Sequence, residues 1–339
     1  MLGRLLLALL LPLQSNAFLP PPLPSPPSPL RSYYDAESDS YIPKGENLGI
    51  VITGGANGVG FAYAKEFLRL GHRVVIADVA NLDAPVAALK REFGEAAPVF
   101  AKRTDVSVWA DVDALGDFAA ESLGAVHHWI NNAGVNGGRR ALLDVPVSEV
   151  QKVVQVNLLG KIFCTKRALE LLGKQEGVTS HLYNTVGSGV KGGGTPGYAC
   201  YGATKRGLPQ FTDSLKRELE EGVQGYEKKE MPGDVKVHTL SPGMVFTKLL
   251  LEDSTPELRK FPFGVLAAQP EEVAQDLVPK ILAAGDSGTS VEFLGTDRIL
   301  TKFFERFVLQ KKSAYIDDNG NVIKLPGEEY DVDGVKALY

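Results

Sequence analysis

A tyrosine and a lysine four residues apart are the side chains of this sequence best placed to move a proton. Tyr201 and Lys205 lie in the stretch GYACYGATK, and on a helix this i, i+4 spacing puts both on one face. A phenol, with a pKa of about 10, is a poor acid at neutral pH, but a nearby ammonium lowers that pKa. Tyr201 could then donate a proton to a carbonyl oxygen, or remove one in the reverse direction. Tyr198 is the weaker candidate because it lies earlier, in a Gly/Pro-rich loop, and the plain alternative is an exposed pair that braces a helix.

Two further polar residues could complete such a site. Ser188 follows an expected strand, where its hydroxyl could hold a substrate oxygen, although a polar residue in a glycine-rich loop needs no function. Asn157 lies within an expected long helix and could support a chain of water molecules leading from Lys205 to solvent. All four residues therefore depend on how strands and helices bring them together.

Short apolar runs and amphipathic stretches alternate along the chain. This alternation predicts an α/β fold with a single Rossmann-type doubly wound parallel sheet and helices on both faces. The expected strands are 49–55, 73–78, 98–106, 127–134, 180–186 and 235–243, and the expected helices are 61–70, 107–123, 148–173 and 199–222.

A glycine-rich turn joins the first expected strand to the first expected helix. Gly54, Gly58 and Gly60 lie in GGANGVG, where glycine permits a tight turn and lets the backbone approach a pyrophosphate at the helix N-terminus. Asp78 ends the second strand, eighteen residues after Gly60. A carboxylate there can accept hydrogen bonds from ribose hydroxyls and would repel a 2′-phosphate, which favours NAD(H).

In this order and spacing, the motifs resemble those of the short-chain dehydrogenase/reductase family. They are TGGANGVG, NNAG, Asn157, Ser188, Tyr201-x-x-x-Lys205 and SPG, over about residues 48–295. The resemblance implies a catalytic tetrad of Asn157, Ser188, Tyr201 and Lys205. Family members usually pair through the helices at 148–173 and 199–222, so a homo-oligomer is expected.

The same resemblance implies where a dinucleotide binds. Lys205 would bind the nicotinamide ribose, Asp105 and Val106 would lie near the adenine, and Thr247 would lie near the carboxamide. The full implied set is Thr53, Gly54, Asn57, Gly58, Gly60, Asp78, Asp105, Val106, Asn132, Ala133, Gly134, Tyr201, Lys205, Pro242, Gly243 and Thr247.

Longer stretches resemble the chlorophyll(ide) b reductases of chlorophyll breakdown, which reduce a formyl group on chlorophyll b. These stretches are TPGYACYGATKRGLPQFTDSL, SPGMVFTKLLL, PEEVAQDLVPKI, DRILTKFFERF and YIDDNGNVI. Residues 244–268 hold many apolar side chains, which suit a lid over a hydrophobic ligand or ordinary helix packing. The resemblance implies a hydrophobic substrate such as chlorophyll(ide) b; another apolar alcohol or carbonyl, such as a terpenoid, sterol or carotenoid derivative, is the alternative.

Two positions depart from that pattern. The chlorophyll(ide) b reductases are associated with NADPH and usually have a basic residue near position 57 or after the second strand, whereas Asn57 and Asp78 stand there. NAD(H) is therefore expected, with NADP(H) possible from the resemblance. The stretch NTVGSGVKGGG also differs from the expected Asp-Gly-Ala-Gly pattern and restores Ser188.

Residues 298–312 predict a basic amphipathic helix. Leu300, Phe303, Phe304, Phe307 and Val308 form one stripe, and lysines and arginines fill much of the rest. Such a helix can lie on a membrane surface, or it can dock on its own core or on another subunit. The stretch IDDNGNVI after it has Val322 at the sixth position of a calcium loop, where that loop needs glycine. It favours an Asn-Gly hairpin turn instead.

The N-terminus has the features of a targeting segment. Residues 1–17 predict a signal peptide, and 18–46 predict a Pro/Ser-rich extended linker before a dehydrogenase domain at 47–297 and a C-terminal helix and tail at 298–339. The combination resembles the bipartite presequences of secondary plastids, so a plastid location is expected, with thylakoid association possible. A disordered tail and an extracellular enzyme are the alternatives.

Composition restricts the other function classes. A net charge of −5 gives no global attraction for nucleic acid, and no basic stripe with interleaved aromatic side chains of the nucleic-acid-binding kind is identified, so nucleic acid is not expected as a partner. Neither the two cysteines nor the five histidines have metal-ligand spacing, so no metal is expected. A scaffold that binds dinucleotide without turnover is a further alternative, which the intact tetrad disfavours.

Overall fold

The computed structural model describes residues 47–187, 193–227, 230–251 and 254–323, and the backbone of two short strands before them. These strands, β1 (Tyr33–Asp35) and β2 (Ser40–Ile42), pair antiparallel within the segment that the sequence predicts to be an extended linker. The predicted signal peptide, Ser188 and the tail after residue 323 lie outside the described residues. The domain boundaries at 17, 46 and 297 stay predictions; the last of them falls within the described helix Thr296–Phe307.

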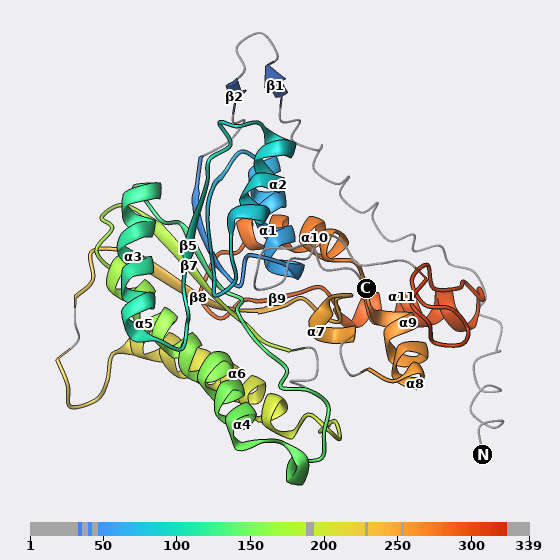
Figure 1. The fold of residues 1–339 in the computed structure, drawn as a ribbon. Helices are drawn as coiled ribbons and strands as arrows, with labels where there is room; N and C mark the ends of the chain where they lie inside the picture. Colours follow the sequence, from blue (N-terminus) through green and yellow to red (C-terminus); the bar gives the residue numbers. More distant parts are fainter. Residues whose placement is uncertain are drawn as a thin grey trace, which may run out of the picture. The chain divides into compact units, whose positions relative to one another are not determined.

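A seven-stranded parallel sheet forms the centre of the fold (Figure 1), which confirms the predicted doubly wound sheet. Its strand order is β5-β4-β3-β6-β7-β8-β9. The order of the chain switches direction between β3 and β6, and open α/β sheets bind ligands beyond the carboxyl ends of the strands at such a point. The strands are β3 (Gly49–Thr53), β4 (Arg73–Asp78), β5 (Val99–Arg103), β6 (His128–Asn131), β7 (Thr179–Thr185), β8 (Asp234–Ser241) and β9 (Ser290–Glu292).

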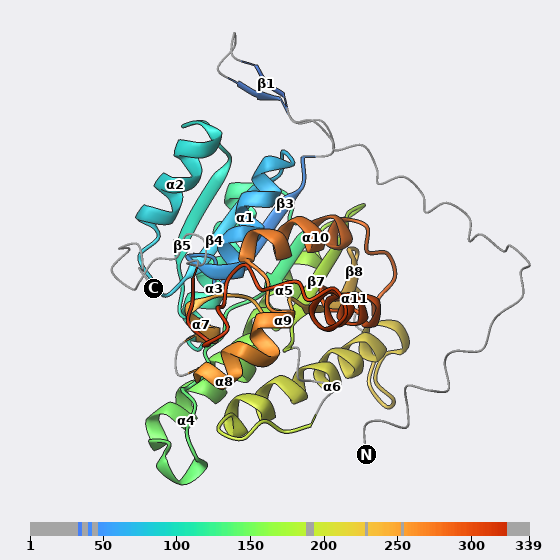
Figure 2. The same ribbon diagram turned by 90° about the vertical axis from the view of Figure 1, so that its right-hand side faces the viewer.

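Helices cover both faces of the sheet (Figure 2), because successive strand residues point to opposite sides. Ile50 and Ile52 of β3 belong to one buried core, which includes residues of α1 (Gly58–Arg69), α2 (Asp83–Phe93) and α10 (Pro270–Leu282). Val51, between them, belongs to the other core, with residues of α3 (Trp109–Leu123), α5 (Gly160–Leu172) and α6 (Ala199–Glu221). Burial on both faces explains why β3 and β4 are near-continuous apolar runs.

The long helix predicted over 148–173 is interrupted by one wider turn. After the short 3-10 turn η2 (Leu142–Asp144), α4 (Val147–Val154) continues into the π-helical turn η3 (Gln155–Leu159) and then into α5. Such π turns occur frequently at functional sites, and this one contains Asn157. The helix predicted over 298–312, α11 (Thr296–Phe307), ends at Phe307 rather than at residue 312.

Residues 244–268 fold into short helices beside the carboxyl ends of the strands. They are α7 (Lys248–Leu251), α8 (Pro256–Leu258), η4 (Arg259–Phe263) and α9 (Gly264–Leu266). Phe246, Leu251 and Phe263 pack with Ile316 in a small core of their own. Ile316 also bridges Val322 antiparallel, which confirms the predicted hairpin. Within the described ranges, no helix combines the length and the apolar character needed to cross a bilayer.

Candidate active site

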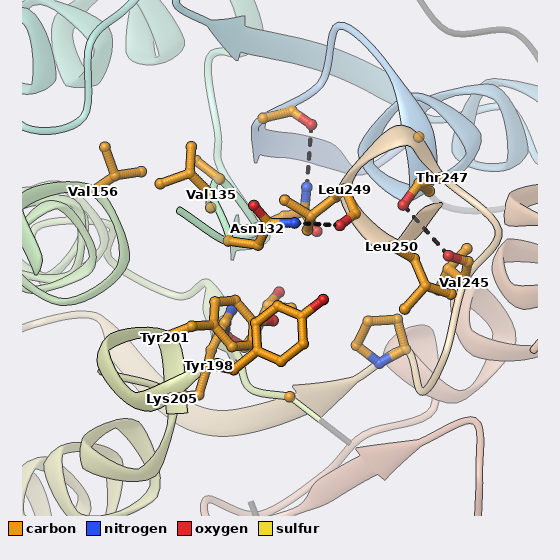
Figure 3. A pocket seen from close by; sticks show the side chains of 18 of the residues that line it. Asn132, Val135, Val156, Tyr198, Tyr201, Lys205, Val245, Thr247, Leu249 and Leu250 are labelled. Atoms are coloured by element: carbon orange, nitrogen blue, oxygen red, sulfur yellow. Dashed lines mark hydrogen bonds between the residues drawn. The ribbon is translucent and has the colours of Figure 1, made fainter. Parts of the chain in front are cut away.

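The carboxyl ends of the strands open onto a cavity of about 1560 Å³. This exceeds the volume of about 300–1,000 Å³ that is typical of ligand pockets. Tyr198, Tyr201 and Lys205 lie on one side of it, and Leu250 and Thr247 lie across from them (Figure 3). The cavity therefore unites residues that the sequence places in separate motifs.

The turn between β3 and α1 requires its glycines. Gly54 and Gly58 have positive φ angles of 68° and 55°, which other residues rarely adopt. A Cβ at position 60 would lie 2.0 Å from the carbonyl oxygen of Gly54. Gly54, Asn57 and Gly58 line the cavity where α1 begins, so the first N–H groups of this helix face it and suit an anion such as a phosphate. Gly60 lies behind the wall, where it permits the close packing of the turn.

The segment after β6 forms part of the cavity wall, and Thr53 fixes it from behind. The Oγ1 of Thr53 accepts hydrogen bonds from the backbone N–H of Asn132 at 3.0 Å and of Ala133 at 3.2 Å. The side chain of Asn132 donates to the carbonyl of Gly54 at 3.1 Å, which joins this segment to the glycine turn. Asn132, Ala133 and Gly134 line the cavity, whereas the almost fully buried Thr53 supports them without lining it.

Lys161 supports the same segment from the opposite side, and the sequence analysis missed it. Its Nζ, which is buried, donates to the carbonyls of Asn131 at 2.7 Å and of Ala133 at 3.0 Å. Burial lowers the pKa of Lys161 well below its usual value, and the ammonium of Lys205 lowers it further. A lysine one helical turn after Asn157, on a face expected to be buried, is the signal that could have revealed it.

Asp78 faces the cavity from the end of β4, as the sequence predicts. Its carboxylate accepts hydrogen bonds from the N–H groups of Ala56 at 3.0 Å and of Ala80 at 3.1 Å. Burial raises the pKa of Asp78, and these backbone hydrogen bonds oppose the rise. A carboxylate has about four lone-pair sites, so Asp78 can still accept hydrogen bonds from the hydroxyls of a ribose.

Asn157 is fully buried and forms hydrogen bonds with the backbone just after Gly134. Its Oδ1 accepts from the N–H of Val135 at 2.8 Å, and its Nδ2 donates to the carbonyl of Val135 at 2.7 Å. A Cβ on Gly134 would lie 3.2 Å from Oδ1 of Asn157 and 3.7 Å from Nζ of Lys205, so both side chains approach this glycine. The predicted water chain from Lys205 stays a prediction. The Asn157 side chain forms hydrogen bonds with the backbone of Val135 and, at 3.4 Å, with the hydroxyl of Thr204.

Tyr201 and Lys205 share one face of α6, as their spacing predicts. The Nζ of Lys205 lies 5.5 Å from the centre of the Tyr201 ring and donates to the carbonyl of Thr185 at 3.3 Å. Burial, with a smaller effect of Tyr198, raises the pKa of Tyr201 to about 12, and burial lowers the pKa of Lys205 to about 8. The expected lowering of the Tyr201 pKa is thus outweighed here by desolvation of the phenol.

Tyr198 also reaches the cavity, although the sequence placed it in a loop. It precedes the first residue of α6, and its ring lies edge-on to the ring of Tyr201 with centroids 6.2 Å apart. The residue is therefore part of the same aromatic wall, and its own spacing from Tyr201 gave no indication of this.

The other predicted contacts lie along the same cavity. Lining it are Asp105, Val106, Pro242, Gly243 and Thr247. Ser188 lies outside the described residues, but Gly187 before it lines the cavity, and a Cβ there would lie 3.8 Å from the hydroxyl of Tyr201. Gly187, the last described residue before Ser188, therefore lies beside the hydroxyl of Tyr201.

An apolar wall closes the cavity on the side of residues 244–268. It consists of Met244, Val245, Leu249, Leu250, Leu258, Pro262 and Phe263. The side chain of Asn136 donates a hydrogen bond of 2.6 Å to the carbonyl of Leu249, which joins the segment after β6 to α7. Part of residues 244–268 thus packs internally and part faces the cavity, and the lid over a hydrophobic ligand stays a prediction.

The chain is similar to known dehydrogenases and reductases over most of its length. Residues 49–257 match the family model described as short chain dehydrogenase. Chlorophyll(ide) b reductase NOL of Arabidopsis thaliana is 37% identical over 277 residues, which cover 79% of this chain and 76% of that protein. Probable chlorophyll(ide) b reductase NYC1 of the same plant is 34% identical over 81% of this chain, which spans only 55% of that protein.

A solved structure shows the same fold. The 3-ketoacyl-(acyl-carrier-protein) reductase of Brucella melitensis, complexed with NADH, superposes with a TM-score of 0.59 and 26% sequence identity, over 73% of this chain and 97% of that one. Together with the family match, this supports an NAD(P)-dependent oxidoreductase.

Proposed function

The chain belongs to the short-chain dehydrogenase family, and from this premise we propose that it reduces a formyl or carbonyl group on a chlorophyll-type pigment. One observation carries the proposal. The Tyr201 and Lys205 pair faces an apolar wall across a cavity of about 1560 Å³, in a chain 37% identical to a chlorophyll(ide) b reductase. A cavity of this volume suits a dinucleotide together with a large apolar substrate.

Each residue of the tetrad has a distinct task in this proposal. Tyr201 donates the proton to the carbonyl oxygen, and the ammonium of Lys205 beside it stabilises the phenolate that remains. Ser188 holds the substrate oxygen. Asn157 keeps Val135, and hence the wall after Gly134, in place.

The cavity also fits a nicotinamide dinucleotide, which supplies the hydride when it is bound. The supporting observation is the glycine turn, where a Cβ at position 60 would meet the carbonyl of Gly54 and where α1 directs its first N–H groups into the cavity. Gly54, Asn57 and Gly58 would hold the pyrophosphate, and Lys205 the nicotinamide ribose. Asp78 would hold the adenosine ribose, which favours NAD(H) over NADP(H) because a 2′-phosphate would meet a carboxylate.

A second candidate substrate class is another apolar carbonyl or alcohol. The apolar wall favours it equally, because leucine, methionine and phenylalanine side chains bury a terpenoid or a sterol as well as a macrocycle. A plastid location, reached through the predicted signal peptide and linker, agrees with the pigment and with the relatives whose names include "chloroplastic".

The deciding measurement is an absorption assay of the protein with chlorophyllide b and either NADH or NADPH. We expect the bands of the conjugated formyl group to disappear, faster with NADH than with NADPH by about tenfold, a difference that corresponds to about 1.4 kcal/mol. An Asp78→Ala variant should lose most of this preference. If dinucleotide binds but the pigment stays unchanged with both cofactors, the pigment proposal is wrong, and apolar aldehydes become the next substrates to assay.

A further inference from the structure

Helix α11 turns its apolar stripe away from the protein. Leu300, Phe304, Phe307 and Val308 follow the i, i+4, i+7, i+8 spacing of one helical face, and each is more than half exposed. With Phe261 and Leu309, which are exposed to a similar degree, they form a surface that we name the aromatic patch. Phe303, the fifth member of the predicted stripe, is half-buried and packs against Phe261, so α11 docks on its own chain through that side chain and leaves the rest of the stripe exposed.

The charged side of α11 is the side that contacts the protein. Arg298 forms an ion pair of 2.6 Å with Asp276 of α10, and its guanidinium lies 4.1 Å from the centre of the Phe293 ring. Lys302 lies over the same ring at 5.9 Å. These contacts fix the rotation of the helix, so the outward direction of the apolar stripe is a property of the fold.

The aromatic patch is continuous with the wall of the cavity. The Phe261 ring lies edge-on to Phe303 of α11, with centroids 6.0 Å apart. Pro262 and Phe263, the next residues of η4, line the cavity. Figures 1 and 2 both draw α11 next to α9, which directly follows η4. One short segment therefore has an outer side in the patch and an inner side in the substrate pocket.

Exposed basic side chains lie at the C-terminal end of the patch. Residues 296–312 carry five basic and two acidic side chains in a chain whose net charge is −5. Lys311 and Lys312, just beyond the helix, are largely exposed although they form ion pairs with Glu305 and Asp318. Long basic side chains can lay their stems on apolar surface and keep their charges at lipid headgroups, where each adds attraction to an anionic bilayer.

We propose that the aromatic patch docks on the surface of an anionic lipid bilayer and brings the mouth of the cavity to the lipid. The docking itself does not depend on the proposed function. Only its benefit rests on that function, because an apolar pigment could then enter the cavity from the bilayer without crossing water. Lipid fits the patch better than a second copy does. The patch has six side chains, whereas a stable protein interface uses about 20–30 residues on each side.

Binding to vesicles tests the docking without any substrate. The full chain is sedimented with vesicles of equal parts phosphatidylglycerol and phosphatidylcholine, and with phosphatidylcholine alone. We expect stronger binding to the anionic vesicles, and a loss of about tenfold in the double variant Phe304→Glu/Phe307→Glu, because two buried apolar side chains become charges. Tyr226→Glu is the matched control, since Tyr226 is 79% exposed beyond the end of α6, a helix on the other face of the sheet.

A local probe separates the patch from any other segment that binds lipid. Phe307→Trp should be quenched by lipids that carry a nitroxide on the acyl chain, whereas Tyr226→Trp should not. Absence of quenching at position 307 overturns the proposal. So does a double variant that binds vesicles as the parent does but forms a smaller oligomer, because a second copy then covers the patch.

The two proposals fail separately. Both glutamate variants should keep the parent rate on chlorophyllide b dissolved in detergent, since neither position lines the cavity. Quenching without pigment turnover leaves the docking and overturns the proposed function, and turnover without quenching does the reverse.

Discussion

Titratable side chains lie in two parts of the described parallel sheet, and their surroundings differ. At the carboxyl ends, Tyr201 and Lys205 border the large cavity. Away from the cavity, all five histidines of the chain gather in and around a partly buried stack of rings. There, His181 lies between His128 and His238 with ring centroids 5.1 and 5.2 Å apart, and the Tyr183 ring lies 4.8 Å from His238.

Burial perturbs the pKa in both places. It raises the pKa of Tyr201 to about 12, and it lowers the pKa of His238 to about 3, with smaller effects of His181 and Lys236. Tyr183 and His238 have no exposed surface, so no ligand reaches them in this structure. A perturbed pKa therefore identifies a functional candidate only where the group also faces a cavity.

The largest expected effect compares Tyr201 at the cavity with Tyr183 in the ring stack inside the sheet. Tyr201→Phe should lower the reduction rate by about 10²–10⁴-fold, because the proton donor is lost, and leave the free energy of unfolding nearly unchanged. Tyr183→Phe should leave the rate unchanged and cost about 1–3 kcal/mol of stability, because Tyr183 donates to the carbonyl of Ile281 at 2.8 Å.

Initial rates and urea unfolding of both variants measure this contrast. Equal losses of rate in the two variants would show that the difference between the two places is not functional.

The histidine stack should make the protein sensitive to acid. The folded pKa values of His128, His181 and His238 lie below the unfolded value of about 6.5, so the unfolded chain binds more protons. Stability should therefore be lost as the pH falls below about 6.5 toward the folded pKa of about 3. His238 alone should contribute a slope of about 1.4 kcal/mol per pH unit within that window.

The measurement is the free energy of unfolding in urea between pH 7.5 and 5. His238→Gln removes one titrating ring, and the slope of stability against pH should become shallower, whatever the change in stability at pH 7.5. An unchanged slope would place the acid sensitivity elsewhere, for example in carboxylates.

The smallest expected effect concerns the contact between the two walls of the cavity. Asn136→Ala removes the hydrogen bond of 2.6 Å to the carbonyl of Leu249, together with one of 2.9 Å accepted from the N–H of Gly138, and the contact with Leu249 is worth about 1 kcal/mol and so about fivefold in an equilibrium. The KM for the large substrate should change by about that factor, while the pH dependence of unfolding stays as in the parent. Steady-state kinetics with chlorophyllide b and with a small aldehyde would show whether the effect requires a large ligand.

Local patterns predicted much of this fold and site. The Tyr201 and Lys205 pair follows from helical periodicity, and Asp78 follows from its place at the end of a strand. The parallel sheet follows from the alternation of apolar runs and amphipathic stretches, and the described structure confirms it.

The remaining features depend on long-range packing, which no local pattern contains. Asn136 and Leu249 are 113 residues apart, and the histidine stack forms because the register of β6, β7 and β8 sets His181 beside His128 and His238 beside Tyr183. The buried position of Lys161 and the raised pKa of Tyr201 depend on the final packing around them. The direction of the apolar stripe of α11 could not be predicted for the same reason, because the sequence of the helix alone does not show which side contacts the protein.

The strand order of the sheet also determines when the site can exist during folding. The cavity is lined by residues from Gly54 to Phe263, from the ends of strands that are distant in sequence and adjacent in space. Parallel strands need long crossovers, so these contacts have high contact order and form late. A half-folded chain that has only β3, α1 and β4 therefore holds the glycine turn and Asp78 but lacks Tyr201, Lys205 and the apolar wall, so a dinucleotide that needs the complete site stabilises only the assembled sheet.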